Sequence, residues 1–77
     1  MTACKLSELA PGTSATVRSF SAQAGPPLRL LEMGLLPGTR LTLVRTAPLG
    51  DPIEIRLRGY HLSLRKAEAS HVLVEPS

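Results

Sequence analysis

The side chains that could act as a nucleophile or bind a metal are few in this 77-residue chain: one cysteine, Cys4, and two histidines, His61 and His71. A cysteine becomes a strong nucleophile only where a nearby group lowers its pKa. Cys4 lies close to the chain terminus, where we expect too little order to hold such a partner. Since no other catalytic arrangement of residues is present, the sequence predicts a protein that is not an enzyme.

The two histidines are the candidate metal ligands, because both occupy polar positions of expected strands. The spacing between His61 and His71 matches no metal-binding motif, and structural zinc sites normally take four ligands. We therefore expect two solvated histidines and no required cofactor, so that any divalent transition metal bound there would be adventitious.

The segment Gly50-Asp51 has some likeness to a phosphate-binding loop. It lacks both the preceding glycine and the following Lys-Ser/Thr of such loops, so the sequence contains no P-loop. Between Gly50 and Pro52, Asp51 is better explained as a turn residue.

Basic side chains are concentrated in residues 40–66, which carry six Arg or Lys and two acidic residues in a chain of net charge +3. The only aromatic residues are Phe20 and Tyr60, so the chain has no stacking platform for unpaired bases. The basic residues mostly alternate with apolar ones, as on the solvated face of a strand. We expect no nucleic-acid binding, and the same shortage of aromatics excludes a groove for Pro-rich peptides.

The elements that must position these side chains are short strands, expected over residues 14–20, 40–46, 53–58, 60–65 and 71–75. Apolar and polar residues alternate with a period of two in these runs, which is typical of half-buried strands. The residues expected to face inward are Ile53, Ile55, Leu57, Tyr60, Leu62, Leu64, Val72 and Val74. Residues 53–58 and 60–65 are close enough in sequence to pair as a hairpin.

Two Pro-Gly pairs, Pro11-Gly12 and Pro37-Gly38, predict type II turns in which the glycine has a positive φ. Residues 27–34 predict a short helix with Pro26 or Pro27 at its first position and Gly34 just past its end. Its apolar stripe is expected to consist of Leu28, Leu31 and Leu35. Residues 66–69 predict one further turn of helix, and residues 6–9 predict either a short turn of helix or an extended entry to the first strand.

These elements predict a single domain, residues 1–77, that is mainly β: a small, partly open antiparallel barrel of about five strands, with one short helix inserted after the first strand. No apolar run is long enough to cross a membrane, so we expect no direct membrane insertion. The chain shows no signal peptide, and its single cysteine cannot form an internal disulfide. We therefore expect a cytoplasmic protein.

Three segments in order resemble the ferrous iron transport protein A family (FeoA). They are Leu30–Thr39, with Met33 at the position of the second leucine of the family's LxxLGhxPGT pattern, Ala47–Ile53, and Gly59–Ala69, and they are followed by a final strand at His71–Val74. The resemblance implies an SH3-like barrel and a cytoplasmic accessory role beside FeoB, the Fe²⁺ permease that carries its own GTPase domain. It also implies a protein without enzymatic activity.

The residues expected to contact the permease are Arg29, Leu30, Glu32 and Met33 on the helix, with Leu49 and Asp51 on what we expect to be a neighbouring loop. The helix is apolar on more than one face, so we expect Leu30 or Met33 to be exposed unless a partner covers it. Polar residues around an apolar centre are typical of interfaces.

Two alternatives remain open. The first is a metal-binding or metal-sensing module that uses His61, His71 or Cys4 and is related to the C-terminal SH3-like domain of metal-dependent repressors. The second is an arginine, Arg29 or Arg65, that enters the GTPase site of the partner. Because an open barrel leaves edge strands unpaired, we also expect a weak homodimer at high concentration.

Overall fold

The computed structural model describes residues 3–21 and 28–76, and short strands dominate them. The strands are β1 (Cys4–Lys5), β2 (Ser14–Phe20), β3 (Arg40–Thr46), β4 (Ile53–Leu57), β5 (Tyr60–Leu64) and β6 (Val72–Pro76). The helices are the 3-10 helix η1 (Leu6–Glu8), α1 (Leu28–Glu32) and α2 (Lys66–Ala69). Pro26 and Pro27, the expected start of α1, lie outside the described residues. No helix in the described part of the chain is long and apolar enough to span a membrane.

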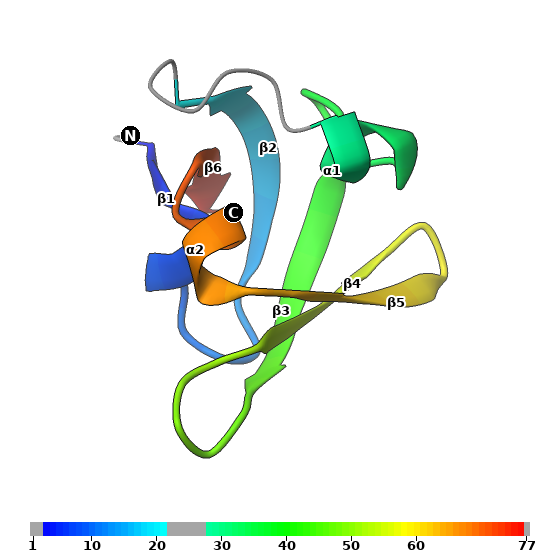
Figure 1. Cartoon of the computed structure of the whole chain (residues 1–77). Coiled ribbons are helices and arrows are strands. Elements are labelled where there is room, and N and C mark those ends of the chain that lie inside the picture. Colours follow the sequence, from blue (N-terminus) through cyan, green and yellow to red (C-terminus); the bar gives the residue numbers. More distant parts are fainter. Residues whose placement is uncertain (1–2, 22–27, 77) are drawn as a thin grey trace.

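All the strands belong to one antiparallel sheet with the order β1-β6-β2-β3-β4-β5. The sheet curls around its own inner face, with α1 at one end and the loop between β3 and β4 at the other (Figure 1). The prediction of a small, mainly β, partly open barrel is confirmed. The additional strand is β1, a two-residue segment that pairs Cys4 with Val74 and is too short to show alternation in the sequence.

The core is built from aliphatic side chains on alternate strand positions, as the period of two predicts. Its fully buried large members are Leu6, Leu30, Leu35, Leu41, Leu43, Ile55, Leu57, Leu64, Val17, Val72 and Val74. Strands β4 and β5 form the expected hairpin, and its register places Ile55 opposite Leu62. A one-residue slip of this pairing would turn every buried side chain outward, so burial itself fixes the register.

The two Pro-Gly turns are type II, as predicted. Gly12 has φ +87° and Gly38 has φ +92°, and each turn is closed by a hydrogen bond from the following threonine N–H to the carbonyl three residues earlier. The second turn sends the chain directly into β3. Glycine is required at both positions because a side chain would strain this backbone conformation.

Helix α1 has a different phase from the one expected. Leu30 is buried in the core, whereas Leu28 is 69% exposed. The cause is the end of the helix, where Gly34 has φ +96° and the N–H groups of Gly34 and Leu35 bond to the carbonyls of Leu31 and Leu30. This Schellman motif brings the residues at C3 and C″, here Leu30 and Leu35, to the same side. Both therefore enter the core, and Leu28 faces solvent.

Tyr60 is 42% exposed, although its position in the alternation predicted an inward side chain. It is the first residue of β5, at the rim of the barrel, and its hydroxyl donates a hydrogen bond to the main-chain carbonyl of Met33. A tyrosine hydroxyl needs such a partner, so the ring covers the end of α1 instead of entering the aliphatic core.

Candidate functional site

The loop between β3 and β4, residues 47–52, presents the most exposed large apolar side chain among the described residues. Leu49 is 97% exposed. The loop is nevertheless tightly built: the N–H of Gly50 bonds to the carbonyl of Ala47 at 2.7 Å, and the N–H of Ala47 bonds to the carbonyl of Pro52 at 3.0 Å. A turn closed twice in this way holds Leu49 out into solvent in a fixed place.

Asp51 fastens the same loop to the neighbouring helix. Its carboxylate accepts a hydrogen bond at 2.9 Å from the main-chain N–H of Lys66, the first residue of α2. The first N–H groups of a helix have no partner within the helix, and a carboxylate there is further favoured by the helix dipole. Asp51 lies in this loop directly after the hydrogen-bonded turn from Ala47 to Gly50, and it satisfies a donor of α2.

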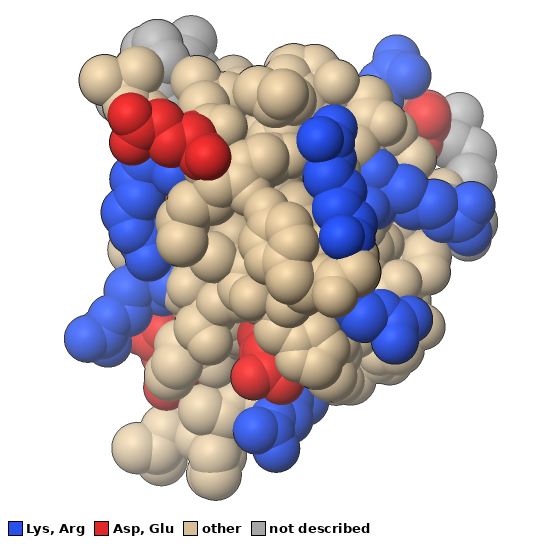
Figure 2. Space-filling view, turned by 90° about the vertical axis from the view of Figure 1, so that its right-hand side faces the viewer, with Lys and Arg blue, Asp and Glu red and all other residues tan. Residues whose placement is uncertain are grey.

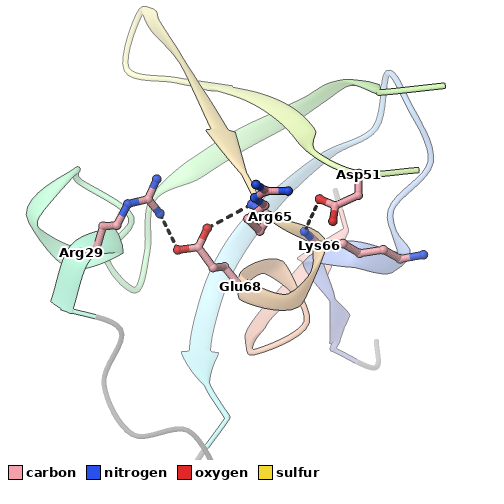
Figure 3. A network of polar contacts seen from close by, with 5 residues as sticks. All are labelled: Arg29, Asp51, Arg65, Lys66 and Glu68. Atoms are coloured by element: carbon pink, nitrogen blue, oxygen red, sulfur yellow. Dashed lines mark hydrogen bonds and ion pairs between the residues drawn. The ribbon is translucent and has the colours of Figure 1, made fainter. Parts of the chain in front are cut away.

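Glu68 makes the corresponding connection to α1 (Figure 3). One carboxylate oxygen accepts the main-chain N–H of Arg65 at 3.0 Å, and the other pairs with the guanidinium of Arg29 at 2.5 Å. The capping role was detectable in the sequence, because a Glu three residues after the residue that precedes a helix is typical of a capping box. The pairing with Arg29 was not, because the two residues are 39 positions apart.

The continuous contact surface expected from the sequence does not exist. Helix α1 and loop 47–52 lie at opposite ends of the molecule (Figure 1), and α2 lies between them (Figure 3). Leu30 is buried, so the expectation that it contributes surface is wrong. Arg29 and Glu32 of α1 are exposed, and Met33, just past the end of the helix, is half-buried against the core. Leu28, which the sequence argument assigned to the core, is the exposed apolar residue of this helix.

An open pocket of about 350 Å³ lies beside the loop. Pro48 and Pro52 form its loop side, and Arg45 and Glu54 line it from β3 and β4. These two charged residues form an ion pair at 3.3 Å. Loop 47–52 therefore combines a projecting apolar side chain with an adjoining hollow that has apolar and charged walls, an arrangement suited to binding another protein.

The candidate metal ligands lie on separate parts of the sheet. His61 is exposed on β5, and His71 is half-buried just before β6; three strands, β4, β3 and β2, lie between β5 and β6 in the sheet order. Within residues 3–21 and 28–76, no three His, Cys, Asp or Glu side chains gather as a metal site would require.

Cys4 is more ordered than expected, because it pairs with Val74 in β1 and packs against the core. Burial, and to a smaller extent the negative charge of Glu8, raises the pKa of its thiol. Both effects disfavour the thiolate, the reactive form of cysteine.

The chain is similar to known proteins over nearly its whole length. The family model described as FeoA domain matches residues 4–76. The Fe(2+) transport protein A/Fe(2+) transporter FeoB fusion protein of Porphyromonas gingivalis is 38% identical over 71 residues, a match that covers 92% of this chain and 8% of the fusion protein.

Two solved structures extend the comparison. The FeoA-like protein from Clostridium acetobutylicum superposes with a TM-score of 0.88 at 39% identity, over 97% of this chain and 88% of that one. The FeoA of Stenotrophomonas maltophilia complexed with zinc, described as an SH3 domain protein, gives a TM-score of 0.77 at 33% identity, over 92% and 88% of the two chains. The expected SH3-like fold is confirmed.

Proposed function

Because the chain belongs to the FeoA family, we propose that it is a non-enzymatic accessory protein of ferrous iron uptake, which docks on the cytoplasmic side of the GTPase-bearing permease FeoB and modulates transport. The observation that carries the proposal is the similarity to part of a single polypeptide that unites an iron transport protein A and FeoB. Fusion gives two parts a high effective concentration, which favours direct contact between them. The chain spans 8% of that polypeptide.

The docking contact that we propose is loop 47–52 with Leu49 as its anchor. A side chain that is 97% exposed gains the most from burial in a partner. The loop is also held in place before binding by its two internal hydrogen bonds and by the bond that the Lys66 N–H donates to the Asp51 carboxylate, so little conformational entropy is lost on docking. Interfaces commonly depend on a few anchors of this kind.

The direct test is the affinity of this protein for purified FeoB from the same organism, measured by biolayer interferometry for the wild type and for Leu49→Ser. Full burial of a leucine contributes about 1.5–3 kcal/mol, so Leu49→Ser should raise Kd roughly ten- to a hundredfold. The matched control is Leu28→Ser, which removes an exposed leucine at the other end of the molecule. Equal affinities for all three proteins would place the contact elsewhere, and absence of wild-type binding would refute the proposal.

Asp51 tests whether the fixed loop matters. Asp51→Ala removes the acceptor that bonds to the Lys66 N–H, whereas Asp51→Asn keeps an oxygen at the same place. We expect the alanine variant to bind FeoB several-fold more weakly and the asparagine variant to recover most of the loss. If both variants bind as the wild type does, loop rigidity has no part in docking.

A further inference from the structure

Three arginines gather at one end of the sheet, around the turn that joins β4 to β5. Arg56 lies opposite Thr42 of β3, Arg40 is two residues earlier on the same face of β3, and Arg58 is in the turn itself. All three are exposed, and Figure 2 shows Lys and Arg side chains grouped over this side of the molecule. We refer to Arg40, Arg56 and Arg58 as the basic end.

No acidic residue in the described part of the chain forms an ion pair with the basic end. The ion pairs formed within residues 3–21 and 28–76 join Arg18 to Glu75, Arg29 to Glu68 and Arg45 to Glu54, so Arg40, Arg56 and Arg58 take part in none of them. The acidic residue of β4, Glu54, is thus already engaged. The basic end therefore presents uncompensated positive charge to whatever approaches it.

Arg58 also occupies a backbone conformation that does not suit it. The two-residue turn Arg58-Gly59 has φ values of +51° and +84°, as in a type I′ turn. Asn or Gly is preferred at the first position, because a larger side chain there crowds the backbone. A residue held against its local preference indicates a role other than folding, and for arginine that role is its charge.

Exposed apolar side chains lie beside these charges. Tyr60 follows the turn and is 42% exposed, and its ring is held by the hydrogen bond to Met33. Leu36, 41% exposed, lies on the segment that leads from Met33 to Arg40. Arginines next to a tyrosine and a leucine are the composition found where proteins rest on the interfacial region of a bilayer.

We propose that the basic end binds the surface of a membrane through the phosphate groups of anionic lipids. The choice of a bilayer over an acidic protein segment rests on the three arginine side chains of the basic end, which form no hydrogen bond or ion pair within the described residues and are therefore free to move. A rigid partner requires groups that are positioned in advance, whereas mobile headgroups in a fluid bilayer adjust to flexible guanidinium groups.

This inference goes beyond docking on the permease, because it concerns lipid alone. Strand β4 runs between the two surfaces. Loop 47–52 precedes its first residue, Ile53, and the basic end consists of Arg56 near its other end, Arg58 just after it and Arg40 at the start of the neighbouring β3. A molecule resting on a bilayer through its basic end therefore keeps Leu49 available for a protein partner (Figure 1). Weak lipid binding would confine the protein to the surface in which its partner is embedded.

The expected binding is weak and sensitive to salt. Each basic residue near an anionic surface contributes about a fivefold increase in partition, so the three arginines together contribute roughly a hundredfold. Salt shortens the range of this attraction from about 10 Å at 0.1 M to about 3 Å at 1 M. High salt should therefore release most of the bound protein.

The test is co-sedimentation of the full chain with vesicles of phosphatidylglycerol and phosphatidylcholine, and with vesicles of phosphatidylcholine alone. We expect binding to the anionic vesicles only. Arg58→Asn should reduce the partition about fivefold while leaving the melting temperature equal or higher, because Asn suits the turn. The triple variant Arg40→Gln, Arg56→Gln, Arg58→Asn should have a partition onto anionic vesicles that is roughly a hundredfold lower than that of the wild type.

The matched control is Arg45→Gln, which removes the same charge from the far end of β3, where Arg45 pairs with Glu54. Its partition should stay close to the wild-type value. The proposal is overturned if Arg45→Gln reduces binding as much as Arg58→Asn does, or if both kinds of vesicle bind equally. It is also overturned if the protein does not co-sediment with either kind of vesicle but binds soluble polyglutamate through the basic end, since this surface would then recognise acidic protein. Because no permease is present, the result is independent of the docking proposal.

Discussion

Gly34 and Tyr60 are coupled in a way that can be measured. A Cβ added at Gly34 would lie 2.9 Å from the Tyr60 hydroxyl, the same hydroxyl that bonds to the Met33 carbonyl. Gly34→Ala therefore carries two costs. The left-handed backbone, φ +96°, costs an alanine about 1–2 kcal/mol, and displacement of the hydroxyl removes a hydrogen bond worth about 0.5–1.5 kcal/mol.

The matched control for the backbone cost is Gly38→Ala. Gly38 has nearly the same φ, +92°, but an added Cβ there meets nothing within 4 Å. Unfolding in urea, followed by far-ultraviolet circular dichroism, should give a loss of about 1–2 kcal/mol for Gly38→Ala and about 1 kcal/mol more for Gly34→Ala.

A double-mutant cycle completes the test. Tyr60→Phe should lower the free energy of unfolding by about 1 kcal/mol in the wild-type background. In the Gly34→Ala background it should change this free energy by nearly nothing, because the hydrogen bond to Met33 is already lost there. The reasoning is refuted if Gly34→Ala and Gly38→Ala cost the same and Tyr60→Phe has the same effect in both backgrounds.

Further predictions concern the core, the cap of α2, the thiol and self-association. Leu57→Ala should destabilise the protein by about 2–5 kcal/mol in the same urea assay, and unchanged stability would mean that its face of β4 is assigned wrongly. Glu68→Gln loses the exposed ion pair but keeps an acceptor for the Arg65 N–H, so it should lower the free energy of unfolding by less than about 1 kcal/mol. Glu68→Ala loses both contacts and should lower it by about 1–2 kcal/mol; equal losses would contradict the capping role. The raised pKa of Cys4 should make its alkylation at neutral pH slower than that of a cysteine in an unstructured peptide, and Glu8→Gln should accelerate it; an alkylation rate equal to that of the peptide would contradict the raised pKa. The same shift should make the free energy of unfolding fall as the pH rises above the thiol pKa of the unfolded chain. The exposed edges of β1 and β5 favour a weak homodimer, which sedimentation equilibrium would detect at high concentration; a monomer up to millimolar concentration would count against it.

The parts of the fold that the sequence predicted well are those decided by neighbouring residues. Alternation fixes which side of β4 faces inward, because Ile53, Ile55 and Leu57 are all buried. The Pro-Gly pairs determine their own turns, because proline presets one dihedral angle and glycine accepts the other. The order of three short motifs was sufficient to identify the family.

The parts that the sequence could not predict depend on contacts between distant residues. The phase of α1 follows from its C-terminal cap, which pairs Leu30 with Leu35, and an apolar stripe counted from Leu28 misses this. The connections of α2 join residues 15 and 39 positions apart. A charged residue at the surface has many potential partners, so only the folded geometry identifies the one that it meets.

The rate of Fe²⁺ uptake by cells that contain the permease tests the central claim most directly. Uptake should be compared in cells that produce FeoB with the wild-type chain, with Leu49→Ser, or with no such chain. We expect the wild-type chain to change the initial rate of uptake, and Leu49→Ser, although folded by circular dichroism, to behave as the cells without the chain do. Equal rates with and without the wild-type chain would contradict an accessory role in ferrous iron transport.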